Sequence, residues 1–283
     1  MTPDRLARPG VLGPRSARVR QARRLTRRSA RAVAGRFLVE GPQGLREALG
    51  RPDLLEEVFV TDLAAQRYGD LLDRATRSGA SVLRVDEAAI GTLAETVTPQ
   101  GLVAVCRVVD VPLAEALAGS PKLVVVLAQV RDPGNAGTVT RVADAAGADA
   151  VVLTEGSVDP HNGKAVRASA GSLFHVPLVV GTPLAAALAG CREAGLVVLA
   201  ADAHASLDLD AAADAGLLAS PTTWLFGTEA HGLPTGAVAL ADRAVRVPIH
   251  GAAESLNLAT AAAVCLYASA RAQRRSPDGP VQD

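Results

Sequence analysis

The feature that most constrains the fold is a regular alternation of short apolar runs with helix-length segments in the second half of the chain. The first run, LVVVLAQV at 123–130, is apolar at nearly every position, which is typical of a parallel strand covered by helices on both faces. Further runs of this kind follow at 150–154, 176–180, 196–201, 222–227 and 244–249. The sequence therefore predicts an α/β fold with a mostly parallel sheet. The last segment, 255–275, is apolar on all sides over its first two-thirds, which predicts a helix buried in the core or in a subunit interface.

A smaller α/β unit precedes this block. Strand-like runs at 37–40, 55–61, 81–85 and 102–109 alternate with helical segments at 42–50, 63–78 and 86–96. We expect a disordered arm, an N-terminal domain, a linker, a C-terminal domain and a disordered tail, with boundaries at 1–14, 15–110, 111–121, 122–275 and 276–283.

The charge of the chain is zero overall but unevenly distributed. Lys+Arg and Asp+Glu both number 29, yet residues 1–40 hold 11 Arg against only Asp4 and Glu40, which gives +9 there and −9 elsewhere. The segment 15–36 has helix formers and predicts a basic helix that contacts a polyanion. Because 27 of the 29 basic residues are Arg, the richness in Arg also reflects composition bias and is not a signal by itself. With aromatic residues at 2%, base-stacking platforms are not expected to dominate binding.

Several classes of protein are excluded by simple patterns. Cys106, Cys191 and Cys265 are far apart and form no CxxC, which indicates a reducing compartment and no zinc site. The histidines show no metal-ligand spacing, and no apolar run reaches the ~20 residues that span a bilayer. The N-terminus lacks the apolar segment of a secretory signal, although its Arg- and Ser-containing, acid-poor character also resembles a mitochondrial transit peptide. We expect a cytoplasmic protein.

The first of three notable loops, RDPGNAGTVTR at 131–141, follows the most apolar strand directly. Its Asp-Pro-Gly is turn chemistry, Asn135 is placed to cap the next helix, and Arg141 lies two turns into that helix. A plain strand–turn–helix junction explains the same residues. The loop also imitates a dinucleotide-binding fingerprint, with Glu155 about twenty residues on, but one glycine of G-x-G-x-x-G is missing.

The other two loops also follow strands. In WLFGTEAHGLP at 224–234, glycines flank Glu229 at a strand end, where α/β sheets hold ligands with backbone groups. A tight turn with an acid at a helix N-terminus is the simpler alternative. In VPIHGAAESLNLATA at 247–261, Ser255 stands where an N-cap belongs, while Asn257 is a poor residue inside a helix and is expected to serve another purpose.

Taken in order, DPGNAGTVTR, FGTEAHGL and VPIHGAAESLNLATA resemble the signature motifs of the SpoU (TrmH-like) family of RNA ribose 2′-O-methyltransferases in the SPOUT class. The resemblance spans about 122–275. Upstream, RFLVEGPQGLREAL and the alternation to residue 109 are similar to the family's RNA substrate-binding domain, which has a ribosomal-protein-like fold. The resemblance implies a trefoil-knotted α/β domain, S-adenosylmethionine as methyl donor, and a homodimer formed through the C-terminal domain.

The resemblance also assigns site residues. The catalytic set it implies is Asn135, Arg141, Glu229, Ser255 and Asn257. The donor-binding set is Phe226, Gly227, Val247, Ile249 and Leu256. The RNA-binding set follows from the charge pattern and not from the resemblance: Arg15, Arg18, Arg20, Arg23, Arg24, Arg27, Arg28 and Arg167. Arg167 either pairs with a phosphate or simply faces solvent, and the residue spacing predicts no metal ligand.

Within this hypothesis, Arg141 clamps the phosphate beside the target ribose, because a guanidinium stays protonated and makes a poor base. Large-subunit rRNA is favoured as substrate, with tRNA as the alternative, by analogy with relatives that carry a full N-terminal domain. Two other classes stay open at this point: a catalytically inactive RNA-binding homologue or scaffold, and a nicotinamide-dependent oxidoreductase.

Overall fold

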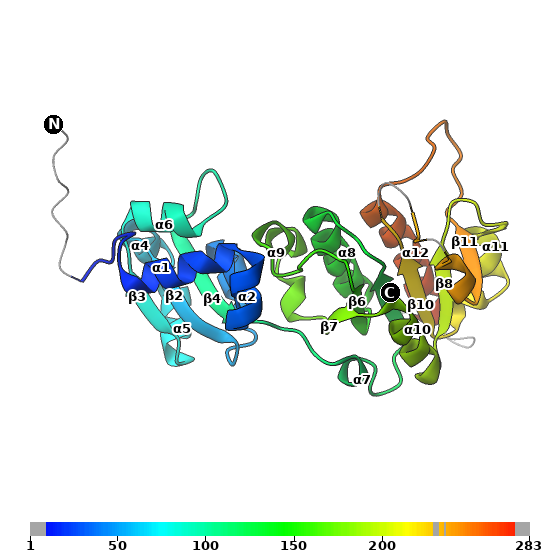
Figure 1. Ribbon diagram of the computed structural model, residues 1–283, viewed down its shortest axis with the longest axis horizontal. Helices are drawn as coiled ribbons and strands as arrows, with labels where there is room; N and C mark the ends of the chain where they lie inside the picture. Colours follow the sequence, from blue (N-terminus) through cyan, green and yellow to red (C-terminus); the bar gives the residue numbers. More distant parts are fainter. Residues whose placement is uncertain (1–9, 229–231, 235, 275–283) are drawn as a thin grey trace, which may run out of the picture. The chain divides into compact units, whose positions relative to one another are not determined.

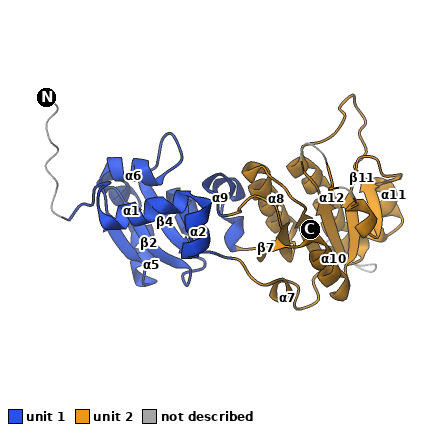
Figure 2. Cartoon of the chain, in the orientation of Figure 1, with its two compact units in different colours: residues 1–109, 161–174 blue, residues 110–160, 175–283 orange. Residues whose placement is uncertain are grey.

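The computed structural model describes residues 10–228, 232–234 and 236–274. The chain forms two compact units (Figure 2), and each is described by itself. The first unit consists of Met1–Val109 and His161–Phe174, and the second of Asp110–Pro160 and His175–Asp283. The chain therefore leaves the second unit after Pro160 and returns to it at His175. The segment 161–174 falls inside the range predicted for the C-terminal domain, but the structure groups it with the first unit.

A four-stranded mixed sheet forms the centre of the first unit, in the order β1-β4-β2-β3. Its strands are β1 (Arg36–Glu40), β2 (Leu55–Val60), β3 (Ser81–Arg84) and β4 (Leu102–Arg107). The β1–β4 and β4–β2 pairs are antiparallel and the β2–β3 pair is parallel. The helices between them are α3 (Gly41–Ala48), α4 (Asp62–Arg67), α5 (Gly69–Arg77) and α6 (Glu87–Leu93). The helix predicted over 63–78 is thus divided at Tyr68, which caps α5 with a non-helical backbone.

The basic segment predicted as one helix over 15–36 is three short elements. These are α1 (Ala17–Arg23), the 3-10 turn η1 (Arg24–Thr26) and α2 (Arg28–Ala34). The break lies at Arg27, whose backbone is extended (φ −100°, ψ 133°). Val19, Ala22 and Leu25 are buried in one cluster with strand residues of the sheet. The segment is therefore part of the core of the first unit as well as a carrier of charge.

The structure also corrects the extent of the arm predicted over 1–14. Leu12 pairs with Val85 as a parallel bridge, and its N–H donates to the carbonyl of Arg84 over 2.8 Å. These bonds hold Leu12 beside β3, where the sequence predicted disorder. Residues 1–9 and the tail predicted over 276–283 lie outside the described residues.

The segment 161–174 packs into the first unit through aromatic contacts. It contains α9 (Gly163–Ser169) and the 3-10 turn η2 (Ser172–Phe174). The ring centroid of Phe37 lies 4.7 Å from that of His161 and 6.1 Å from that of Phe174. Phe37 is fully buried on β1, so these rings complete one side of the first unit's core.

The second unit is built on a seven-stranded parallel sheet, in the order β7-β6-β5-β10-β8-β11-β9 (Figure 1). Its strands are β5 (Leu123–Leu127), β6 (Ala150–Thr154), β7 (Leu178–Thr182), β8 (Val197–Ala201), β9 (Leu207–Asp208), β10 (Thr222–Phe226) and β11 (Arg243–Arg246). Every residue of β5, β6 and β10 is buried, as the uninterrupted apolar runs predict. The α/β class and the mostly parallel sheet are confirmed. The two-residue β9 was not predicted.

Helices cover both faces of this sheet. The helices α7 (Leu113–Ala116) and α10 (Leu184–Glu193) bury their apolar residues on one face, against Val124 and Val126 of β5. The helices α8 (Pro133–Ala146) and α12 (Leu258–Arg274) pack against each other, and α12 contacts β10. Trp224 of β10 donates its indole N–H to Ser269 Oγ of α12 over 2.9 Å in the buried interior. The short α11 (Leu209–Asp214) also contacts α12.

Two further expectations concern the threading of the chain and the crossing of a membrane. The trefoil knot that the resemblance implies is a property of chain threading, which the strand order does not give, and it stays a prediction. Within the described residues, no helix is both long and apolar enough to cross a membrane.

Candidate active site

The three loops singled out in the sequence leave the same edge of the second unit's sheet. They follow β5, β10 and β11. The strand β10 pairs with β5 and with β8, and β8 pairs with β11; all three pairings are parallel. The carboxyl ends of parallel strands share one edge, and this edge is where open α/β sheets hold ligands. The tertiary structure therefore places the beginnings of all three loops along one line.

The first loop is held by Asp132, which was not among the predicted site residues. Its Oδ1 accepts the N–H of Asn135 over 2.8 Å, and Asp132 is the N-cap of α8. The prediction that Asn135 caps this helix is wrong by three positions. Both residues are good caps, and Pro133 decides between them because proline fits the first helical position but not the interior. Asn135 lies in the first turn, where its side chain serves a different contact.

The third loop ends at Asn257, which caps α12. Asn257 Oδ1 accepts the N–H of Ala259 over 2.9 Å and that of Thr260 over 3.4 Å. The expectation that Ser255 is the cap is therefore corrected, since α12 begins at Leu258 and Ser255 is exposed in the loop before it. Capping with the oxygen leaves the amide nitrogen of Asn257 as a donor for another group.

That nitrogen joins the first and third loops. Asn257 Nδ2 donates to Asn135 Oδ1 over 3.1 Å, across 122 residues of sequence. The bond links the N-terminal ends of α8 and α12, two helices that also pack along their lengths. Of the five residues predicted as catalytic, the structure brings these two into direct contact.

Arg141 lies on α8 six residues after Asn135, or about 9 Å further along the helix axis. Its side chain is exposed, and no hydrogen bond or ion pair to another described residue holds it. A guanidinium is charged at any physiological pH and offers a fork of five N–H donors. Arg141 is therefore a cation on the surface of α8 with its donors available to a substrate.

The second loop folds back on itself directly after β10. The N–H of Thr228 donates to the carbonyl of Gly232 over 2.7 Å, and that of Gly232 donates to the carbonyl of Thr228 over 3.0 Å. A Cβ atom on Gly227 would lie 2.1 Å from the carbonyl carbon and oxygen of Gly232, so no other residue fits this fold of the backbone. Glu229, predicted as the acid of this loop, lies outside the described residues.

The predicted donor-binding residues combine backbone groups with half-covered apolar side chains. Phe226 is 1% exposed and its ring stacks on Trp224, so a ligand at the sheet edge would meet its backbone and not its ring. Val247 and Leu256 are half-buried and Ile249 is 38% exposed, all in the connection between β11 and α12 (Figure 1). Apolar side chains that are only partly covered suit the flat ring of a ligand, and strand-end backbone groups suit its polar edge. These residues therefore fit an adenosyl group.

Gln129 is a residue at this edge that sequence reasoning missed. It follows β5 with φ +55°, a conformation that is uncommon for a residue other than glycine, and its N–H donates to Thr154 Oγ1 over 3.1 Å. Backbone conformations of this kind cluster at functional sites, because the surrounding structure has to hold them. Nothing in the local sequence signals them, since glutamine has no preference for positive φ.

The three cysteines carry no chemistry in the described structure. All are free and buried, and burial raises the pKa of each thiol, that of Cys265 to about 12. They remain neutral thiols, which are neither nucleophiles nor metal ligands at neutral pH. The described residues contain no group of three or more His, Cys, Asp or Glu that could hold a metal ion.

The predicted RNA-binding arginines lie in the first unit. Those of the basic segment are all exposed, namely Arg15, Arg18, Arg20, Arg23, Arg24, Arg27 and Arg28. Arg18 also pairs with Glu57 over 3.2 Å. Arg31, not part of the predicted set, is buried and donates to the carbonyl of Leu25 over 2.9 Å. The seven predicted arginines of the segment are therefore exposed to solvent, whereas the buried Arg31 is bonded to the turn that contains Leu25.

Arg167 has a different environment from the other predicted RNA-binding residues. Its guanidinium lies 2.7 Å from Glu40 Oε1 and 3.5 Å from Glu95 Oε2, within the first unit. Glu40 also accepts the N–H of Glu95 over 2.8 Å and the hydroxyl of Thr96 over 2.9 Å. Arg167 therefore ties α9 to the sheet, and its role in RNA binding stays a prediction.

Comparisons with known proteins cover almost the whole described chain. The SpoU rRNA Methylase family matches residues 122–267, and the MRM3-like substrate binding domain matches residues 16–104. The chain is 33% identical over 253 residues to the 23S rRNA (guanosine(2553)-2′-O)-methyltransferase RlmP of Bacillus subtilis, covering 89% of this chain and 96% of that protein. Over 225 residues it is 31% identical to the 23S rRNA (guanosine-2′-O-)-methyltransferase RlmB of Bordetella pertussis, covering 78% of this chain and 90% of that protein.

Solved structures agree with these relatives. The crystal structure of an AdoMet-bound rRNA methyltransferase from Sinorhizobium meliloti superimposes with a TM-score of 0.77 at 28% identity, over 93% of this chain and 98% of that chain. The SpoU methyltransferase AviRb from Streptomyces viridochromogenes gives a TM-score of 0.77 at 28% identity, over 91% and 98%. A match over more than half of the chain, supported by relatives that align along nearly their full length, shows that this protein belongs to the SpoU rRNA methylase family.

Proposed function

We propose that this protein transfers a methyl group from S-adenosylmethionine to a ribose 2′-hydroxyl of RNA, with large-subunit rRNA as the substrate. The observation that carries the proposal is the Asn257–Asn135 hydrogen bond, which joins two of the family's motifs at the sheet edge. Arg141 is exposed on α8, the helix that also carries Asn135. The named 23S rRNA methyltransferases among the relatives support the choice of rRNA. An action on ribosomal RNA and three free thiols fit a cytoplasmic location.

The proposal divides the work between two domains. Residues 15–110 would bind the RNA, and residues 122–275 would hold the donor and carry out the transfer. When bound, S-adenosylmethionine supplies a methyl group that its sulfonium already activates. The backbone at Phe226 and Gly227 and the apolar side chains of Val247, Ile249 and Leu256 would hold its adenosyl part. The protein's remaining task is to align the ribose oxygen and manage one proton.

Arg141 performs that task in this proposal. Its fork of N–H donors binds the phosphate beside the target ribose in bidentate fashion, which fixes the sugar in place. The same positive charge stabilises the negative charge that develops on the 2′-oxygen as its proton leaves to water or to a phosphate oxygen. The Asn135–Asn257 bond holds the ends of α8 and α12 together, so that Arg141 keeps its position relative to the third loop.

Mapping of 2′-O-methyl groups tests the function directly. The purified protein is incubated with ribosomal RNA that lacks these modifications and with a tritiated methyl donor. Label at one nucleotide of large-subunit rRNA supports the proposal, and label in tRNA alone moves the substrate to the alternative. Donor binding without transfer to any RNA would make the protein a catalytically inactive homologue.

The arginines of the basic segment are proposed to bind RNA phosphates. Arg20, Arg23 and Arg28 are exposed, and their replacement with glutamine keeps the helical propensity while removing three charges. Each arginine–phosphate ion pair with single-stranded RNA adds ~0.7 to the slope of log K against log salt, so the slope of the triple variant is expected to be shallower by about 2 units. The measurement is fluorescence anisotropy over a salt series, with Arg74→Gln on α5 as an exposed control. An unchanged slope would remove these residues from the interface.

A homodimer through the C-terminal domain is part of the proposal. On α12, Val264 is 39% and Tyr267 is 53% exposed, and with Thr260 and Arg271 they follow the i, i+4, i+7, i+11 spacing of one helix stripe. The two exposed apolar side chains of this stripe, Val264 and Tyr267, are the proposed subunit contact, with Thr260 and Arg271 at its ends. Tyr267→Arg is therefore expected to shift the protein from dimer to monomer in analytical ultracentrifugation. Wild-type protein that sediments as a monomer at micromolar concentration would exclude the dimer.

A further inference from the structure

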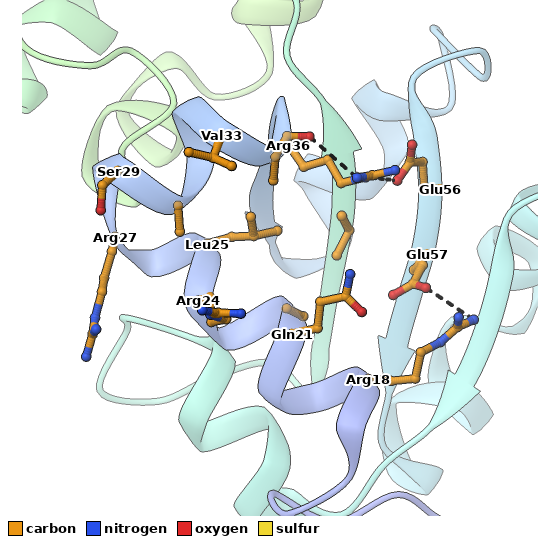
Figure 3. Close-up of a pocket in the computed structure, with 14 residues that line it drawn as sticks. Arg18, Gln21, Arg24, Leu25, Arg27, Ser29, Val33, Arg36, Glu56 and Glu57 are labelled. Atoms are coloured by element: carbon orange, nitrogen blue, oxygen red, sulfur yellow. Dashed lines mark hydrogen bonds and ion pairs between the residues drawn. The ribbon is translucent and has the colours of Figure 1, made fainter.

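The first unit contains a groove that the proposed methyl transfer does not require. Its volume is about 620 Å³, within the ~300–1,000 Å³ of small-molecule sites. It lies between the basic segment on one side and strand residues of β2 and β4 on the other (Figure 3). The basic segment contributes residues between 18 and 34, and Arg36, Glu56, Glu57 and Val105 of the strands complete the lining.

One part of the lining is apolar. Leu25 and Val105 are buried in the core of the first unit and form apolar lining of the groove, while Ala30 and Ala34 are half-buried. Val33 is 92% exposed, so its side chain adds uncovered apolar surface to the groove. A flat ring that covers apolar surface of this kind removes it from water, which favours binding.

The strand side of the groove supplies hydrogen-bond acceptors. Glu56 accepts from Arg36 Nε, and Glu57 lies 3.2 Å from Arg18 Nη2 (Figure 3). A carboxylate has about four lone-pair positions, so each retains acceptor capacity after one arginine bond. The two ion pairs also neutralise the carboxylates, so they repel a phosphate-bearing ligand less than two free acids would.

The helix side supplies cations and an amide. Arg24 and Arg27 are exposed, and Gln21 extends toward the strands from α1 (Figure 3). A guanidinium plane can stack on a base or bind a phosphate, and an amide can both donate to and accept from a base edge. The groove therefore offers separate sites for a ring, for the amino groups on its edge and for an adjoining phosphate.

We infer that this groove holds one unstacked RNA nucleotide whose base carries an exocyclic amino group. The apolar lining covers the ring, Glu56 and Glu57 accept from the amino group, and Arg24 and Arg27 bind the backbone phosphates. The inference rests on the proposed function, because it takes the substrate to be RNA, and it adds that the first unit selects a base as well as binding charge.

The test measures base preference with the full chain. Fluorescein-labelled ten-nucleotide oligo(A), oligo(C) and oligo(U) are titrated by anisotropy at one fixed salt concentration. Wild type is expected to bind oligo(A) and oligo(C) about tenfold more tightly than oligo(U), which corresponds to ~1.4 kcal/mol. Ala30→Leu fills the groove without changing charge and is expected to abolish this preference while keeping the affinity for oligo(U). Ala32→Leu, on the same helix but outside the groove, is the matched control and should retain the preference.

A second variant removes an edge contact without adding volume. Gln21→Ala truncates an exposed side chain, so the fold is preserved, and the preference for amino-bearing bases is expected to fall at least threefold. Equal binding of the three oligonucleotides by wild type, or a preference that survives both variants, overturns the inference. Transfer of methyl groups to rRNA by wild type is measured in parallel. Transfer without a base preference removes only the nucleotide site, and the absence of transfer to any RNA removes the proposed function itself.

Discussion

Arg141→Ala is expected to reduce methyl transfer to RNA by about 100- to 1,000-fold, because it removes the charge that stabilises the developing 2′-oxyanion and fixes the neighbouring phosphate. Donor affinity should change little, since Arg141 is exposed on α8 and makes no hydrogen bond or ion pair with the described donor-binding residues. Single-turnover methyl transfer and calorimetric donor binding separate the two effects. Arg141→Lys keeps the charge but not the fork, so its rate should fall between wild type and alanine.

Arg243→Ala provides the matched control for this experiment. Arg243 is also exposed and cationic, but it stands at the amino end of β11, on the opposite edge of the sheet from the three loops. It is expected to retain wild-type turnover. Wild-type turnover by Arg141→Ala would exclude the proposed clamp, and loss of donor binding alone would make Arg141 a structural residue.

Gly227→Val should abolish measurable donor binding and destabilise the second unit. The added Cβ would lie 2.1 Å from backbone atoms of Gly232, which is closer than non-bonded atoms approach in proteins. Because these are backbone atoms, they cannot rotate away as the end of a side chain can. The Thr228–Gly232 hydrogen bonds must then break. Overpacking of this kind typically costs ~1–3 kcal/mol of folding free energy, so thermal unfolding should begin several degrees lower.

Gly69→Ala is the control for the glycine substitution. A Cβ at Gly69 meets no atom within 4 Å, and its φ is not positive, so donor binding and unfolding temperature should both be unchanged. Donor affinity at the wild-type level in Gly227→Val would show that the fold-back of the second loop is not needed for the donor site.

The sheet of the second unit could be predicted closely because its strands carry their own signal. Runs such as LVVVL in β5 and AVVLT in β6 are buried at every position and end within a few residues of the predicted limits. Covered parallel strands need apolar side chains on both faces, so short, β-branched apolar runs mark them, whereas the longer apolar segment at the end of the chain forms a helix. The two-residue β9 carries no such run and was missed.

Helix beginnings were less predictable than strands. Asp132 and Asn135 both qualify as caps by composition, and so do Ser255 and Asn257. The structure selects Asp132 and Asn257. The selection at α12 depends on where packing against α8 and the sheet begins to bury the helix, and Leu258, its first residue, is already buried, with 8% of its surface exposed. No local pattern contains that information.

The structure of the basic segment also depends on residues far away in the sequence. The eleven arginines of residues 1–40 predicted a cationic surface, and the arginines of the basic segment between 15 and 28 are exposed. The break at Arg27 and the burial of Val19 and Leu25, however, depend on strands further along the chain. The grouping of 161–174 with the first unit likewise depends on Phe37, more than a hundred residues earlier. Removing residues 1–36 would therefore disturb a core and not only a charged arm.

By itself, the sequence determined the α/β class, the order of the strands along the chain, the three loops and the family to which they belong, because these depend on residue type and spacing over short stretches. Only the tertiary structure decided that Asn135 and Asn257 meet, that Gly227 lies against Gly232, and that a groove opens beside Gln21 and Val33. Contacts between atoms of remote residues follow from how helices and strands pack, and packing is a property of the assembled chain that no short stretch of it encodes.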